Sequence, residues 1–94
     1  MTQEQELENQ ILEGQKAENL LNNPMLSGWL LSRKASLFDS FNNTKADDDE
    51  LRRLIWLKMQ VLTELEQDLR QTIEGGKIAK STLKEFINSI RGRR

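Results

Sequence analysis

The chain has 94 residues, of which 36% are hydrophobic and 31% are charged, and its formal net charge is −1. It contains no Cys and no His, which excludes disulfides, zinc–thiolate sites and catalysis by a Cys nucleophile or a His base. A domain of this size has a thin hydrophobic core, and small helical proteins often gain stability by associating.

Two features bear on membranes and secretion. No run of 18 apolar residues occurs, so the sequence predicts no transmembrane helix and no membrane partner. Residues 1–6 are polar and acidic, which is unlike a signal peptide. The lack of Cys fits a reducing cytoplasm.

A first helix is expected over about residues 2–21. Thr2 and Gln5 have the spacing of a capping box, in which two side chains satisfy free backbone N–H groups. Apolar residues then recur at intervals of three and four, but Gly14 and Glu18 interrupt the stripe. This helix is therefore expected to fray or to become ordered on a partner, and residues 1–22 are predicted as a segment separate from a single domain of residues 23–94.

A second helix is expected over about residues 25–41. Asn23 suits its N-cap and Pro24 its first turn, and Pro24 also ends the helix before it. The polar residues 42–46 predict a loop. One face of the helix collects four apolar residues, with three more flanking it: Leu26, Leu30, Leu37 and Phe41, then Trp29, Leu31 and Phe38.

A third helix is expected over about residues 48–74. The acidic residues 47–50 lie where a helix N-terminus favours negative charge, and they lack the spaced ligands and glycine of a calcium loop, so no metal is predicted. A seam with alternating spacings of four and three comprises Leu51, Ile55, Lys58, Leu62, Leu65, Leu69 and Thr72. Beside it runs a second stripe, Leu54, Leu57 and Val61.

The chain after the third helix is predicted to contain one further short helix. Gly75 and Gly76 predict a helix end, and Thr82 and Glu85 predict a new N-terminus for a helix over about residues 82–91. The expected fold is thus all-α, a small helical bundle built on a helical hairpin, with one long central helix and a short C-terminal helix.

Two sets of candidate binding residues follow from these patterns. Residues 54–62 are apolar nearly all round the helix, which one neighbouring helix cannot cover, so an interface with another protein is predicted at Leu54, Leu57, Val61, Trp29 and Trp56. The charge is also uneven, because residues 1–50 sum to −6 and residues 51–94 to +5. Contact with phosphate or an acidic partner is the corresponding hypothesis for the basic end, Arg91, Arg93 and Arg94.

Residues 18–77 resemble small uncharacterised helical proteins of tailed bacteriophages and prophages. The similar pattern begins with Glu18-Asn19-Leu20-Leu21-Asn22-Asn23-Pro24 and continues through Leu37-Phe38-x-x-Phe41-x-x-Thr44, Glu50-Leu51-Arg52-x-x-x-Trp56, Leu62-x-x-Leu65-x-x-x-Leu69 and Ile73-Glu74-x-Gly76-Lys77. The resemblance implies a gene neighbourhood of virion assembly, near packaging and head genes, and a place in the host cell cytoplasm or the virion. It supplies no catalytic or binding residues.

The sequence therefore leads to a non-enzymatic protein without a cofactor that binds other macromolecules. The principal hypothesis is a bacteriophage structural or assembly protein that binds head, portal or packaging proteins, or itself as a homo-oligomer. One alternative is a nucleic-acid-binding packaging or regulatory factor, such as a small terminase subunit. Another is a phage-encoded inhibitor of a host defence protein, acting through its acidic N-terminal half.

Overall fold

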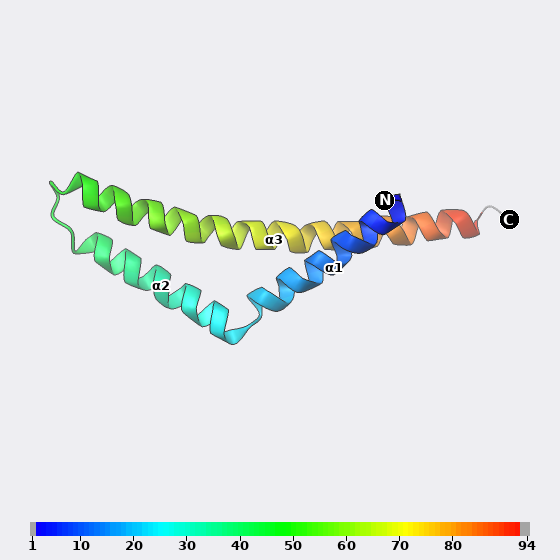
Figure 1. The fold of residues 1–94 in the computed structure, drawn as a ribbon, viewed down its shortest axis with the longest axis horizontal. Helices are drawn as coiled ribbons and strands as arrows, with labels where there is room; N and C mark the ends of the chain where they lie inside the picture. The colour runs from blue at the N-terminus through cyan, green and yellow to red at the C-terminus, as the bar shows by residue number, and fades with distance from the viewer. Residues whose placement is uncertain (1, 93–94) are drawn as a thin grey trace. The chain divides into compact units, whose positions relative to one another are not determined.

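The chain folds into three α-helices, as the computed structural model shows for residues 2–92 (Figure 1). They are α1 (Gln3–Leu21), α2 (Pro24–Asn42) and α3 (Asp49–Arg91). No strand occurs in these residues, which confirms the predicted all-α class. Within the same span, no helix is both long enough and apolar enough to cross a membrane.

The predicted N-terminal caps of the first two helices are present. At α1 the Thr2 N–H donates to the Gln5 Oε1 at 3.1 Å, and the Gln5 N–H donates to the Thr2 Oγ1 at 3.2 Å, which is a reciprocal capping box. At α2 the Asn23 Oδ1 accepts from the Met25 N–H at 2.9 Å, and Pro24 occupies the first turn. The boundary between α1 and α2 is therefore specified by local chemistry.

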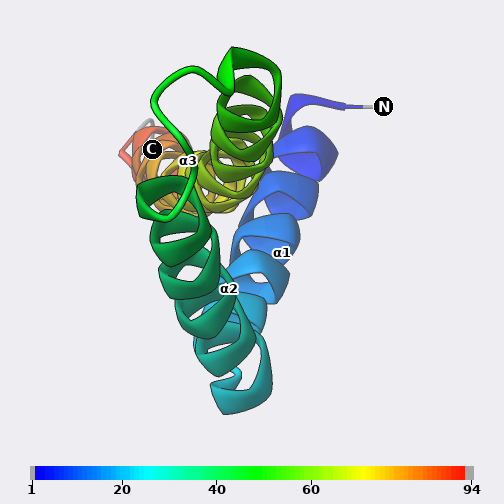
Figure 2. The ribbon, with the colours of Figure 1, turned by 90° about the vertical axis from the view of Figure 1, so that its left-hand side faces the viewer.

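A short polar connection joins α2 to α3 (Figure 2). The Asn43 N–H closes the end of α2 on the Asp39 carbonyl at 3.1 Å, and the Thr44 hydroxyl donates to the Phe41 carbonyl at 2.7 Å. Asp48 starts α3, because its Oδ1 accepts from the Leu51 N–H at 3.3 Å. The acidic residues therefore lie at the N-terminus of α3, as the sequence predicts.

Two compact units make up the chain, and the first to be described comprises residues 21–67. In it α2 lies antiparallel to the first part of α3, since Lys34 Nζ meets Glu66 Oε1 at 2.6 Å and the Arg52 guanidinium lies 4.5 Å from the centre of the Phe41 ring. Its core is a small aliphatic cluster, Leu30, Leu37 and Ile55, with exposed fractions of 7% or less. The predicted apolar face of α2 is therefore the packed face.

The other unit consists of α1 and the second part of α3, within residues 1–20 and 68–94. Its buried residues are small: Ala17, Ala79, Gly14 and Gly76. A Cβ built on Gly14 would lie 2.9 Å from the Gly76 Cα and 3.2 Å from the Thr72 carbonyl oxygen. The two helix backbones therefore touch, and only glycine fits at the point of contact.

The structure corrects the predicted helix end at Gly75 and Gly76. Helix α3 continues through both residues to Arg91, so the separate short C-terminal helix is wrong, as is the cap at Thr82. The Thr82 hydroxyl instead donates to the Ile78 carbonyl at 2.9 Å inside the helix. The physical reason is that the spacing of four and three continues past the glycines, as Gly76, Ala79, Leu83, Phe86 and Ile90, so packing along α3 outweighs the low helix propensity of glycine.

The prediction that Gly14 weakens the packing face of α1 is also wrong, because this glycine lies at the contact with α3. Gly14 is buried, and it is the residue through which α1 approaches α3. A missing side chain lowers the apolar periodicity of a sequence, but it also removes the obstacle to close helix packing. Glu18 is exposed and does not take part in this contact face.

Candidate protein-binding surface

An exposed aliphatic stripe runs along the first part of α3. Leu54, Leu57 and Val61 are 49%, 44% and 62% exposed, and Leu65 extends the row at 43%. Their spacings of three, four and four residues keep them on one side of the helix. Ile55, which faces α2, is only 7% exposed. The stripe defined by these four residues, the α3 stripe, therefore lies beside the packed face of α3 and not on it.

The two tryptophans predicted at the interface are half exposed, but they do not join the α3 stripe. Trp56 is 50% exposed and lies two positions from Leu54, so the two side chains leave α3 on nearly opposite sides. Trp29 belongs to α2 and is 54% exposed. The five predicted interface residues are thus distributed over more than one face of residues 21–67.

Trp56 and Leu57 border a shallow hollow on the surface of α3. Its other lining residues are polar: Gln60, Thr63, Glu64 and Gln67. A second hollow lies near the start of the helix and is lined by Asp48, Glu50, Leu51, Arg53, Leu54 and Leu57. Leu57 contributes to both, so the α3 stripe is bordered by polar and charged groups, as protein interfaces commonly are.

Two charged side chains flank the α3 stripe. Arg53 and Glu64 are both exposed, and neither forms an ion pair with another residue in the described span. They lie eleven residues apart, which is about three turns, so both leave α3 on the same side. An apolar row with one free cation near one end and one free anion near the other offers both hydrophobic and electrostatic complementarity to a partner.

Further exposed apolar residues occur on α2. Leu31 and Phe38 are 71% and 58% exposed, and their separation of seven residues places them on one side of the helix. They are two of the three residues that were predicted to flank the apolar face of this helix. Only the packing of α2 against α3 shows that the core ends at Leu30 and Leu37.

The basic residues form a longer row than the predicted one. Arg91 is exposed, whereas Arg93 and Arg94 lie outside the described residues. Four more exposed basic residues share the side of α3 on which Arg91 lies, at spacings of seven, three, four and seven: Arg70, Lys77, Lys80 and Lys84. These four were not predicted, because the expected break at the glycines divided one basic row between two helices.

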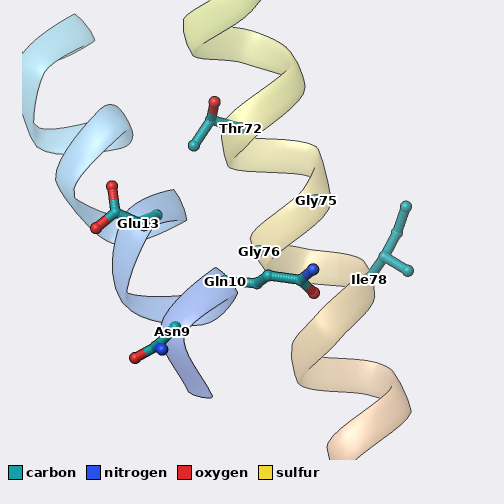
Figure 3. Close-up of a pocket in the computed structure, with 7 residues that line it drawn as sticks. All are labelled: Asn9, Gln10, Glu13, Thr72, Gly75, Gly76 and Ile78. Carbon is teal, nitrogen blue, oxygen red and sulfur yellow. The ribbon is translucent and has the colours of Figure 1, made fainter. Parts of the chain in front are cut away.

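A groove of about 380 Å³ lies where α1 meets α3 (Figure 3). Asn9, Gln10 and Glu13 line it from α1, while Thr72, Gly75, Gly76 and Ile78 line it from α3. The Glu13 carboxylate already pairs with Lys16 at 3.4 Å. The groove follows from the glycine contact, which brings the backbones together without side chains to fill the space beside them.

The described residues contain no group of three or more Asp, Glu, His or Cys side chains placed to hold a metal ion. No protein-family model, no curated protein and no solved structure matches the chain.

Proposed function

We propose that this chain is a non-enzymatic helical binding protein whose α3 stripe docks against another protein. The resemblance to phage proteins supports partners in virion assembly, such as head, portal or packaging proteins, or a second copy of the chain. On this proposal the small helical bundle is completed in the host cytoplasm or the virion, when a partner helix covers the stripe.

The observation that carries this proposal is the exposure of four neighbouring aliphatic side chains, 43–62% each, on one side of a single helix. Removing apolar surface from water stabilises a complex by roughly 25 cal/mol per Å². Monomeric proteins seldom leave contiguous apolar patches of this kind uncovered. Helix α2 already packs on the adjacent face through Ile55, so a partner is needed for the stripe.

The double substitution Leu54→Lys, Leu57→Lys tests the proposal. Two charges on the stripe should abolish binding without unfolding the protein, because both residues are exposed in the single chain. The measurement is mass spectrometry of purified phage particles made with the wild-type or the variant protein. We expect the wild-type protein to be recovered with the particles or their assembly intermediates and the variant to be lost.

The matched control is Gln15→Lys, Asn19→Lys, which adds the same charge at exposed polar positions of α1 that line none of the hollows described above. It should be recovered as well as the wild type, and all three proteins should show equal helix content by circular dichroism. Recovery of the Leu54→Lys, Leu57→Lys variant would contradict docking through the stripe, and absence of the wild type from particles and intermediates would contradict a partner in virion assembly.

A second candidate function is contact with nucleic acid, which the basic row on α3 favours. The row is about 30 Å long at the α-helical rise per residue, and it comprises Arg70, Lys77, Lys80, Lys84 and Arg91. Over this length, a helix can reach several phosphates of a duplex. Lys77 also pairs with Glu74 at 3.3 Å, but this pair is exposed and weak.

Salt dependence tests this second function. Replacing Lys80 and Lys84 by Gln should weaken binding to duplex DNA and reduce the salt slope by about 0.9 for each lost phosphate contact. Lys45→Gln, which removes an exposed charge from the loop before α3, is the control. A wild-type protein that fails to bind duplex DNA even at low salt would exclude this function.

A further inference from the structure

We propose that the occupant of the α3 stripe is a second copy of this chain, lying antiparallel across it about a two-fold axis level with residue 59. The inference rests on the proposed function, in that the stripe must be a protein-binding surface. It goes further by naming the partner, its direction and its register. Every residue that carries it belongs to α3.

The spacing of the aliphatic residues is symmetric about one point. Leu57 and Val61 are centred on residue 59, and Leu54 and Leu65 are centred between residues 59 and 60. An antiparallel copy related by a two-fold axis at this level therefore sets Leu57 opposite Val61 and Leu54 opposite Leu65. All four are 43–62% exposed in the single chain, so each layer of the contact buries apolar surface.

The flanking charges select the direction. Arg53 and Glu64 are centred between residues 58 and 59, so the same axis sets each Arg53 opposite the Glu64 of the other copy. A parallel pair would leave Arg53 and the Glu64 of the other copy eleven residues, about 16 Å, apart along the helices, so these charges could not pair. Neither side chain has an ion-pair partner among residues 2–92, so both are free to pair between copies.

The same register brings two acidic residues together at each outer end of the contact. Glu50 and Asp68 are also centred on residue 59, and both are acidic and exposed. Each lies nine residues, or about 13 Å along the helix, from the two-fold axis. In the antiparallel pair, Glu50 of one copy therefore lies opposite Asp68 of the other. Removing one of these charges, in Asp68→Asn, should therefore strengthen the association.

Charge reversal and exchange test the proposal by sedimentation of the full chain. Arg53→Glu and Glu64→Arg should each raise the dimer dissociation constant about tenfold or more, because each turns two attractive contacts into two repulsive ones. The double variant R53E/E64R should recover wild-type association. An equimolar mixture of the two single variants should form heterodimers, since both contacts between them are attractive.

Arg70→Glu is the matched control, because it reverses an exposed charge on the opposite side of α3 from the stripe, and it should dimerise as the wild type does. Unchanged dimerisation of Arg53→Glu, or failure of the double variant to recover, would overturn the antiparallel register. Helix content by circular dichroism identifies any variant that fails to fold, and comparison of the other single variant with the double variant then supplies the test.

A wild-type protein that remains monomeric at high micromolar concentration would overturn the second-copy proposal as a whole. The proposed function is decided separately, by recovery of the wild type and loss of the Leu54→Lys, Leu57→Lys variant in particles or intermediates. A monomer that still shows this difference binds a different protein through the same stripe.

Discussion

Gly75 and Gly76 are neighbours in the chain with opposite environments. A Cβ on Gly75 would meet nothing within 4 Å, whereas a Cβ on Gly76 would lie 3.0 Å from both the Gln10 carbonyl oxygen and the Gly14 Cα. Both of these atoms belong to the backbone of α1, so they move only if the helix moves. Gly76 is therefore needed for packing, while Gly75 only lowers helix propensity.

We predict that the two alanine substitutions have opposite signs. Gly75→Ala should stabilise the chain by about 0.5–1 kcal/mol, the usual gain for replacing glycine inside a helix. Gly76→Ala gains the same propensity, but it should be destabilising overall because forcing a methyl group into a packed contact costs about 1–3 kcal/mol. Urea unfolding monitored by circular dichroism measures both, and equal effects would show that α1 does not pack on α3 through this residue.

At the scale of the element, α2 shows how little of an apolar helix is core. Leu30 and Leu31 are adjacent leucines, yet the first is 3% exposed and the second 71%. The difference follows from the 100° turn between successive residues of an α-helix, which moves Leu31 off the face that contacts α3. The ion pair between Lys34 and Glu66 lies at the edge of this contact and adds little stability by itself.

This contrast gives a matched pair of substitutions in α2. Leu30→Ala should lower the free energy of unfolding by about 2–5 kcal/mol, as expected for a buried leucine. Leu31→Ala should change it by less than about 0.5 kcal/mol in the isolated chain, as expected for a surface position. Comparable losses in thermal or urea unfolding would mean that Leu31 is covered in solution by another molecule.

On the scale of the whole molecule, the described residues bury few large side chains. The buried hydrophobic residues are Ala17, Leu30, Leu37, Ile55 and Ala79, and none of the larger three is below 3% exposed. A chain with so small a core gains proportionately more from association than a larger domain does. Stability and assembly are therefore expected to be linked.

We predict that the thermal unfolding midpoint of the wild-type protein rises with protein concentration, because association stabilises the folded state by mass action. The Leu54→Lys, Leu57→Lys variant should have a midpoint that does not depend on concentration. Differential scanning calorimetry over a wide concentration range measures this. A wild-type midpoint independent of concentration would show that folding does not depend on self-association.

The sequence alone determined the features that arise from neighbours in the chain. The capping box of Thr2 and Gln5, the cap at Asn23 and the acidic start of α3 all involve residues within three positions of one another. Helical periodicity likewise separated Leu30 and Leu37 from the polar positions of α2, and it identified the Leu54, Leu57, Val61 row before its exposure was known.

Only the tertiary structure decided the roles that depend on residues far apart in the chain. Gly76 was predicted to end a helix, because a local pattern cannot reveal that Gly14 packs against it across the α1–α3 contact. The continuity of α3 through the glycines also joins the basic residues from Arg70 to Arg91 into a single row. Periodicity shows that a face is apolar, but exposure is set by which face the neighbouring helix occupies, and that choice is made by packing.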